Sequence, residues 1–369
     1  MSTESLVHKI ALGMIPGVGD ITARKLVSYT GSVEAVFKES YRSLTRIPGV
    51  GEQLAKAVAG REYLAEAARE AEFVAKHGIK VFFYLDDDYP FRLRQCEDSP
   101  VTFYFRGKAD LNSPFILSIV GTRNATQRGR EICQKIVAGL SVHFPGLIII
   151  SGLAYGIDIA AHKAALANGL PTVAVLGHGL KTIYPSLHSG VAKSILENGG
   201  QLTDFSSDTL PERNNFIRRN RIIAGISDAT LIVESGLRGG ALITADIAAS
   251  YNREVMAVPG RPGDEWSAGC NALIRCNKAA LVEGHEDIEY LLGWKPAALA
   301  APVQTVLFSG MTDSERKIYE ALKTEGDMTV DLLTRLLDMP VNKLSTILLQ
   351  MELAGLITPC PGSVYRIRG

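Results

Sequence analysis

Short apolar segments alternate with amphipathic ones between residues 115 and 283, and this alternation constrains the fold more than any other feature of the chain. Segments of strand length and composition lie at 115–120, 147–151, 172–177, 201–205, 229–234, 254–259 and 279–283. Patterns with the period of an α-helix lie between them, near 127–142, 157–168, 186–198 and 240–251. Apolar strands separated by such helices are typical of a parallel sheet with helices on both faces. The sequence therefore predicts an α/β fold with a mostly parallel, doubly wound sheet.

The first 75 residues are expected to be helical and contain an internal repeat. Ile15-Pro16-Gly17-Val18-Gly19 recurs as Ile47-Pro48-Gly49-Val50-Gly51, and each copy leads into a helical pattern. Two glycines between helices resemble the helix–hairpin–helix motif, in which backbone N–H groups at a helix start can face a phosphate. Asp20 and Glu52 follow the two copies and would repel phosphate, so at least one copy is expected to be purely structural. Contact between the other copy and DNA stays open.

These patterns divide the chain into four parts. A helical helix–hairpin–helix (SAM-like) domain is expected over 1–75, and the sheet domain, with two further strands, over 76–295. Residues 296–310, rich in Pro and Ala, are expected to form a linker, and 311–369 a winged-helix-like domain of three helices and a β-ribbon. That last domain has seven Lys and Arg against eight Asp and Glu, which favours a protein-contact or regulatory role over reading a DNA groove.

Composition limits the partner and the compartment. Lys and Arg number 39, as do Asp and Glu, so a nucleic-acid site has to be a local basic patch. Five cysteines without a CxxC pair indicate a reduced, cytoplasmic compartment. No secretory signal and no membrane span are expected, because the sequence has neither a basic start followed by an apolar run nor an apolar run of about 18 residues. No His, Cys or Asp cluster has metal-ligand spacing, and neither a metal nor a cofactor is expected.

Small residues at the strand ends indicate a phosphate site. In an open parallel sheet, ligands bind beyond the carboxyl ends of the strands. Four predicted strands end in short loops of small residues, and a glycine pair opens the helix after the last of them: Gly121-Thr122-Arg123, Ser151-Gly152, Gly177-His178-Gly179, Ser235-Gly236 and Gly239-Gly240. Backbone N–H groups can approach an anion closely at such positions. We therefore expect a phosphate-binding crevice at this edge, to which Arg123 adds a positive charge.

The basic stretch from Arg213 to Gly225 supplies candidate partners for that crevice. It carries four arginines, three asparagines and one aromatic residue, Phe216. Arginines donate charge-assisted hydrogen bonds to phosphate, and an exposed ring can stack on a base. The alternative is a solvated helix face whose arginines pair with carboxylates. The glycine loops favour the first interpretation, with this stretch opposite Arg123, while the direction of Arg218 stays open.

Two classes of enzyme are disfavoured. The dinucleotide fingerprint GxGxxG is absent after the first strand of the sheet, and its partial match at 177–182 lacks the third glycine. A hydrolytic set of Ser151, Asp158 and His162, with His178 nearby, requires contacts that spacing cannot establish. Asp158 is expected instead to be a carboxylate favoured by a helix dipole, and His162 a packed histidine.

Over roughly residues 100–290, the chain closely resembles the DNA-processing protein A family, also called DprA/Smf. The motifs that carry this resemblance are IVGTR (119–123), SGLAYGIDIAAHKAAL (151–166), GHGLKTIYP (177–185), RNRIIAGIS (219–227), SGLRGGALITADIA (235–248), AVPG (257–260) and GCNALIR (269–275). The resemblance implies a Rossmann-like, non-enzymatic protein that binds single-stranded DNA. It also implies loading of the recombinase RecA onto that strand during natural transformation, and a homodimer formed through the central domain.

The resemblance extends to single residues. Arg123 matches an arginine that holds backbone phosphate, Arg213 stands where some members have a DNA-contacting lysine, and Arg219-Asn220-Arg221 match an RNR that lines the same pocket. Ile217 and Arg218 depart from the family's Pro and small residue, and Ser186 replaces a basic residue of some members, so one phosphate contact is expected to be missing. The residues expected to bind DNA are Gly121, Thr122, Arg123, Ser151, Gly152, Arg213, Phe216, Arg219, Asn220, Arg221, Gly239 and Gly240.

Two other functions are weighed against DNA binding. One is a nucleoside-monophosphate N-glycosidase, an enzyme class of related Rossmann-like fold. That class resembles PGGxGTxxE where this chain has SGLRGGALIT (235–244), so its catalytic glutamate has no counterpart. The other is a structural adaptor that works only through residues 311–369.

Overall fold

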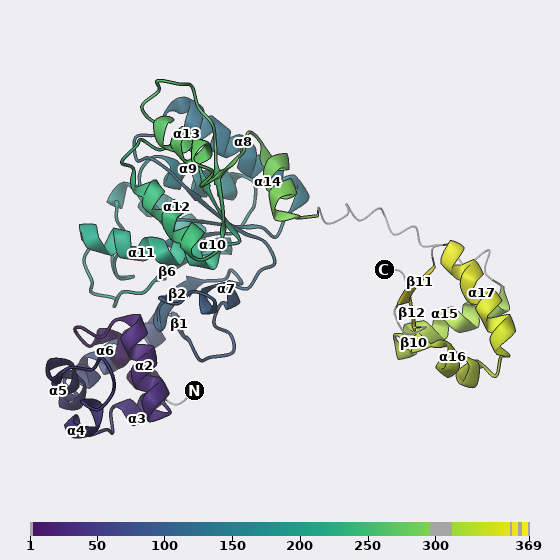
Figure 1. The fold of residues 1–369 in the computed structure, drawn as a ribbon, viewed down its shortest axis with the longest axis horizontal. Coiled ribbons are helices and arrows are strands. Elements are labelled where there is room, and N and C mark those ends of the chain that lie inside the picture. The colour runs from purple at the N-terminus through teal and green to yellow at the C-terminus, as the bar shows by residue number, and fades with distance from the viewer. Residues whose placement is uncertain (1–2, 296–311, 355, 361–363, 368–369) are drawn as a thin grey trace. The chain divides into compact units, whose positions relative to one another are not determined.

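We describe the chain from a computed structural model, which describes residues 3–295, 312–354, 356–360 and 364–367 (Figure 1). These residues belong to two compact units, Met1–Ala297 and Ala298–Gly369, which are treated separately below. The predicted linker, 296–310, lies outside the described residues. No helix in the described ranges combines the length and the apolar character needed to cross a bilayer.

A nine-stranded sheet forms the centre of the first unit, in the order β1-β2-β6-β5-β4-β3-β7-β8-β9. All pairs from β6 to β9 are parallel, whereas β1 pairs with β2 and β2 with β6 in antiparallel fashion. The strands are β1 (Lys80–Phe83), β2 (Thr102–Gly107), β3 (Ile116–Val120), β4 (Ile148–Ser151), β5 (Thr172–Val175), β6 (Gly200–Thr203), β7 (Ala229–Ile232), β8 (Glu254–Ala257) and β9 (Ala280–Leu281). The predicted mostly parallel sheet is thereby confirmed.

Helices cover both faces of this sheet. Residues of β3 alternate between the two: Ile116 and Val120 pack in one apolar core with α11 and α12, while Leu117 and Ile119 pack in another with α8 and α9. Figure 1 shows α11 and α12 beside each other on one of these faces. The helices are α7 (Phe91–Arg94), α8 (Gln127–His143), α9 (Ile157–Ala167), α10 (Ser189–Asn198), α11 (Arg213–Ile226), α12 (Gly240–Ser250), α13 (Ala268–Arg275) and α14 (His285–Leu292), with a 3-10 turn at Ser186–His188. This arrangement is doubly wound.

The direction of winding changes at β3. From there, β4 and β5 follow toward one side of the sheet, whereas β7, β8 and β9 lie on the other. Loops that leave neighbouring strands in opposite directions separate at such a switch point and leave room for a ligand beyond the carboxyl ends. The fold therefore places the candidate site next to Gly121, which directly follows β3.

The N-terminal part is helical, as predicted, with α1 (Thr3–Met14), α2 (Asp20–Thr30), α3 (Val33–Val36), α4 (Tyr41–Leu44), α5 (Glu52–Gly60) and α6 (Tyr63–Lys76). Gly17 and Gly49 both have positive φ, of 79° and 85°, which explains why the repeated turn contains glycine. At the first copy, Asp20 accepts a hydrogen bond from the backbone N–H of Val101 and lies 3.1 Å from Arg221. These contacts support a structural role for the first copy.

The second unit has the three helices and the ribbon expected of a winged helix. Helices α15 (Asp313–Glu325), α16 (Val330–Leu337) and α17 (Val341–Leu353) accompany a sheet of order β10-β12-β11, with β10 at Met328–Thr329, β11 at Ile357–Cys360 and β12 at Val364–Ile367. A capping box starts α15, where Thr312 and Glu315 are bonded reciprocally.

Candidate nucleic-acid interface

A pocket of about 480 Å3 opens beyond β3 at the switch point, and we call it the strand-end crevice. It is bounded by the loop after β3, the N-terminal half of α11 and the start of α12. Nine of the twelve residues expected to bind DNA line it: Gly121, Thr122, Arg123, Arg213, Phe216, Arg219, Asn220, Gly239 and Gly240. Segments about 120 residues apart in the sequence thus meet at one pocket, as the strand-end argument predicts.

The loop after β3 is held in one conformation by backbone hydrogen bonds. The N–H of Thr122 donates to the carbonyl of Glu234 (2.7 Å), and the carbonyl of Thr122 accepts from the N–H of Ile157 (3.2 Å). The buried carboxylate of Glu234 accepts from both the N–H and the hydroxyl of Thr126, which caps α8. Arg123 projects from this fixed loop into solvent.

Gly156 allows α9 to approach this loop. Its φ is +79°, and a Cβ at this position would overlap the carbonyl oxygens of Thr122 and Arg123. Gly121 is equally confined, since a Cβ there would lie 2.7 Å from Cβ of Ile157. The glycines of this edge therefore serve close backbone approach as well as the crevice opening.

An aromatic pair lies at the other side of the crevice. The ring of Phe216 lies 5.7 Å from that of Tyr184, and the guanidinium of Arg123 lies 5.9 Å from the centre of the Phe216 ring. Tyr184 is 45% exposed and, although absent from the crevice lining, extends the aromatic surface beside it. Sequence reasoning missed Tyr184 as a site residue, although it lies in the quoted motif at 177–185, because its contact with Phe216 is long-range.

Three exposed arginines give the crevice its charge: Arg123, Arg213 and Arg238. None of them forms an ion pair within the described residues. Unpaired guanidinium groups beside a helix N-terminus favour an anion. Arg238 was also missed, although it precedes the predicted Gly239-Gly240 pair directly.

Arg219 lies at the floor of the crevice and is only 4% exposed. It donates to the carbonyl of Val175, and a Cβ on Gly152 would overlap its guanidinium group, so Gly152 makes room for it. Burial lowers the pKa of Arg219 to about 10, which leaves it charged at neutral pH, while the nearby Asp158 favours its charged form. Burial raises the pKa of Asp158, which accepts a hydrogen bond from the N–H of Gly152. Arg219 contributes a buried charge beneath the crevice rather than a projecting side chain.

Three predicted residues do not line the crevice. Arg221 turns to the opposite side of α11, where it pairs with Asp204 (2.5 Å) and Asp20 (3.1 Å) and donates to the carbonyl of Asp98. The hydroxyl of Ser151 donates to the carbonyl of Ile119, and Gly152 lies behind Arg219. For Arg221, the alternative interpretation, pairing with carboxylates, is the one that the structure supports.

Arg218, whose direction the sequence left open, lies 3.3 Å from Asp204 and over the ring of Phe205. It is absent from the crevice lining.

Two of the four strand-end loops are filled rather than open. Gly177 packs against Phe216, since a Cβ there would lie 2.7 Å from the ring. The loop at Ser235-Gly236 is bonded to the backbone of Trp266 and Gly269. Of the four loops, those after β3 and β4 contribute residues to the crevice lining, together with the start of α12. For Gly177-His178-Gly179, the alternative that its glycines serve a tight turn fits this packing.

The hydrolytic set considered from the sequence is not assembled. Nδ1 of His162 lies 2.7 Å from the hydroxyl of Thr172, and His178 bonds to the backbone of Gly179 and Tyr184. The hydroxyl of Ser151 donates to the carbonyl of Ile119 and contacts Asp158, while both histidines have other partners, so the described residues contain no serine–histidine pair here.

His162 leads to a prediction about pH. Its ring is fully buried, and burial lowers its pKa to about 3, below the value near 6.5 of an exposed histidine. The unfolded chain therefore binds a proton between pH 6.5 and 3 that the folded chain does not, and stability falls as pH falls through that window. We expect the contribution to reach about 2 kcal/mol at pH 5. Denaturant titrations from pH 7.5 to 5 should show a shallower loss in His162→Gln; an identical loss would contradict the assignment.

The strand order and helices define the class: a doubly wound α/β protein with a helix–hairpin–helix module before the sheet domain and a winged-helix module after it. Its crevice lies at the switch point, is lined by basic residues and lacks the GxGxxG loop of dinucleotide-binding proteins. Comparisons with family models agree. Residues 80–293 match the DNA recombination-mediator protein A family, 295–363 a DprA winged helix domain, and 10–59 a SAM-like helix–hairpin–helix tandem. The chain belongs to the DNA recombination-mediator protein A family, as the resemblance predicted. That family is one of recombination mediators rather than enzymes, so the N-glycosidase alternative is wrong.

Individual relatives give the same result. Protein Smf of Escherichia coli is 38% identical over 76% of this chain and 75% of its own length. A putative DNA processing protein DprA of Mycobacterium tuberculosis is 33% identical over 83% of this chain and 80% of its own. Among solved structures, DprA of Streptococcus pneumoniae superposes with a TM-score of 0.64 at 30% identity, over 77% of this chain and 97% of that one. DNA processing protein A of Helicobacter pylori, whose structure concerns its single-stranded DNA binding mode, gives 0.52 at 26% identity, over 58% and 95%.

Proposed function

We propose that this protein binds single-stranded DNA in the strand-end crevice and delivers the strand to the recombinase RecA during natural transformation. The observation that carries the proposal is the meeting of Arg123, Arg213 and Phe216 at one pocket, with the ring of Tyr184 packed against that of Phe216. Family membership and the single-stranded DNA binding mode of the Helicobacter pylori relative support the same function.

The chemistry of the crevice favours a single strand over a duplex. Arg123 and Arg213 would contact successive phosphates, with the N–H groups at Gly239-Gly240 as further donors. The Tyr184–Phe216 pair would offer an aromatic surface on which a base can stack, and base–aromatic stacking contributes about 1–3 kcal/mol for each base. Bases in a duplex are already stacked on each other and cannot use that surface. Single-strand preference therefore follows from the aromatic pair, and overall affinity from the arginines.

The remaining assignments extend this proposal. The domain at 76–295 would hold the DNA, residues 1–75 would support it structurally, and 311–369 would contact another protein. We further propose a homodimer, so that two crevices can engage one strand, and action in the cytoplasm, where incoming strands meet RecA.

A mobility-shift experiment tests the function as a whole. Labelled single-stranded and double-stranded oligonucleotides of equal sequence are titrated with the protein, with and without RecA. We expect preferential retention of the single strand, and a further shift that requires both proteins. Equal retention of the single-stranded and double-stranded oligonucleotides would contradict the single-strand preference. If the protein leaves the amount of RecA bound to the single strand unchanged, delivery is contradicted.

Arg123→Ala tests the crevice through its salt dependence. Loss of one phosphate contact should weaken binding for all sequences alike and make the slope of log K against log salt shallower by about 0.7. Arg275→Ala is the matched control, because Arg275 is exposed in the same unit but lies at the end of α13, outside the crevice lining. Anisotropy titrations at several salt concentrations measure both slopes. An unchanged slope in Arg123→Ala would remove this residue from the interface.

A further inference from the structure

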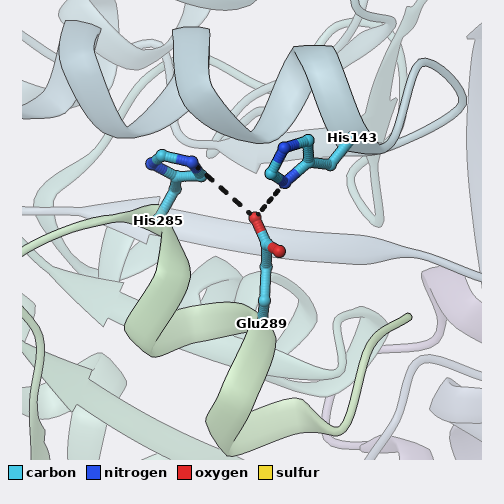
Figure 2. A group of neighbouring side chains, drawn as sticks. All are labelled: His143, His285 and Glu289. Atoms are coloured by element: carbon cyan, nitrogen blue, oxygen red, sulfur yellow. Dashed lines mark hydrogen bonds and ion pairs between the residues drawn. The ribbon is translucent and has the colours of Figure 1, made fainter. Parts of the chain in front are cut away.

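Two histidines and one glutamate come together where α14 packs on α8. Nδ1 of His143, at the end of α8, lies 2.8 Å from Oε1 of Glu289 on α14 (Figure 2). Nε2 of His285 lies 3.9 Å from the same oxygen. All three ligand atoms lie within 4.8 Å of one another. From this arrangement, we propose a binding site for a divalent transition-metal ion, with zinc as the representative ion.

The donor set decides which ions suit the site. Imidazole nitrogens favour zinc, cobalt, nickel, copper and iron, whereas magnesium and calcium prefer oxygen ligands. Two imidazoles and one carboxylate give three protein ligands and leave a fourth position for water, a common arrangement for zinc. Zinc–ligand bonds of about 2.0–2.2 Å require the three atoms to surround a common point, so the side chains would have to rotate from their present separations when the ion binds.

The backbone prepares this arrangement. His285 and Glu289 are four residues apart on α14, so their side chains lie on one face of the helix, the face that meets α8 (Figure 2). Gly139 lies one turn before His143 on α8, and a Cβ there would overlap the ring of His285. A residue larger than glycine at position 139 would displace this ring from the cluster.

A second carboxylate orients one of the ligands. Nδ1 of His285 lies 3.1 Å from Oε2 of Glu286, which can accept a hydrogen bond from Nδ1–H and so leave Nε2 free to bind a metal. A histidine held by a carboxylate through its second nitrogen is the usual arrangement around protein-bound metals, where it fixes the tautomer and the ring orientation.

The three ligand side chains are partly exposed, so an ion can reach them from solvent, and partly buried, so their positions are restrained by packing. They are 35%, 23% and 12% exposed for His143, His285 and Glu289 respectively. A bound ion would cross-link α14 to α8. Trp294, which follows the C-cap of α14, packs on Phe115 and on Phe144 at the end of α8. The metal would therefore fasten the last helix of the first unit to the sheet domain.

Metal binding is tested by thermal unfolding of the full chain. The protein is first treated with a chelator and then supplied with Zn2+ or Mg2+. At a zinc concentration about 100 times the Kd, we expect the unfolding midpoint to rise by about 4 °C, and Mg2+ to have no effect. The visible absorption of added Co2+ should also intensify as imidazoles enter its coordination sphere.

Three variants assign these responses to the cluster. His285→Ala removes a ligand, and Glu289→Gln keeps the shape of the side chain and one acceptor oxygen while removing its charge; each should lower zinc affinity at least tenfold. His77→Ala is the control, because His77 is exposed and bonds only to the carbonyl of Phe73 at the end of α6. Comparison of the metal-free midpoints shows whether each variant is folded.

The result that overturns the proposal is a wild-type chain with neither a midpoint shift nor Co2+ absorption. Equal responses in wild type, His285→Ala and Glu289→Gln would overturn it as well, since the ion would then bind elsewhere. Loss of the response in His77→Ala would have the same meaning.

Discussion

Gly156→Ala should lower the affinity for single-stranded DNA tenfold or more, although Gly156 itself offers no side chain to DNA. The added Cβ would overlap the carbonyl oxygens of Thr122 and Arg123, so the loop after β3 has to move. That loop positions Arg123, whose charge-assisted bond to phosphate contributes about 1.5–3 kcal/mol, or more than tenfold in affinity. An anisotropy titration of a labelled single strand measures the loss.

Gly169→Ala is the matched control for this substitution. Gly169 also has positive φ, of 71°, and lies just beyond the other end of α9, but no atom lies within 4 Å of the added Cβ. Backbone strain should cost both variants about 1–2 kcal/mol of stability, and Gly156→Ala should lose more because the loop also has to move. Only Gly156→Ala should lose DNA affinity. Equal affinities for the two variants would show that the loop conformation does not matter for binding.

Arg221→Ala should have the largest effect on stability and almost none on DNA binding. Its guanidinium group joins Asp20 of the N-terminal helices, Asp204 after β6 and the carbonyl of Asp98. The side chain of Asp204 is 1% exposed, so removal of Arg221 leaves a buried carboxylate with only the longer contact to Arg218. Breaking a buried pair in this way costs about 3–5 kcal/mol and should lower the unfolding midpoint by about 5–10 °C.

The control for Arg221→Ala is an exposed ion pair. Lys278 and Asp246 lie 3.0 Å apart but are 60% and 61% exposed, so Lys278→Ala should leave the unfolding midpoint almost unchanged. Calorimetry measures the midpoints, and anisotropy at a temperature where all variants are folded measures affinity. If folded Arg221→Ala has a much lower affinity for single-stranded DNA and an unchanged unfolding midpoint, Arg221 contacts DNA and the account of its role is wrong.

The sequence predicts the position of the crevice because that position follows from local signals. Strand-length apolar runs define the carboxyl ends of the strands, and parallel strands bring Gly121 and the Gly239-Gly240 pair to one edge. Arg213 and Phe216 open the helix that borders the same edge. These conclusions need only periodicity and the geometry of parallel sheets.

The roles of individual arginines on α11 could not be obtained in the same way. Arg219 and Arg221 are two positions apart, which is about 200° around a helix, so they face nearly opposite directions. Which of them meets the crevice depends on Asp20 and Asp204, whose positions are set by tertiary packing. A count of basic residues assigns both to DNA, whereas the structure assigns Arg221 to an ion-pair network.

Long-range packing also explains the other differences between the sequence predictions and the structure. The loop at Gly177 is filled by Phe216, and the glutamate and histidine of the proposed metal site are contributed by segments 146 residues apart. Only the pair His285 and Glu289 has a recognisable spacing in the sequence, and two residues four apart are too common to indicate a metal.

The central claim, that single-stranded DNA occupies the strand-end crevice, is tested most directly by photocrosslinking. An oligonucleotide that carries halogenated uracils is irradiated in complex with the full chain, and the crosslinked peptides are identified by mass spectrometry. We predict crosslinks at Tyr184 or Phe216, which are lost in excess unlabelled single strand and retained in excess duplex. Crosslinks confined to residues 3–76 or 313–367 would contradict the account, because the strand would then be held outside the crevice.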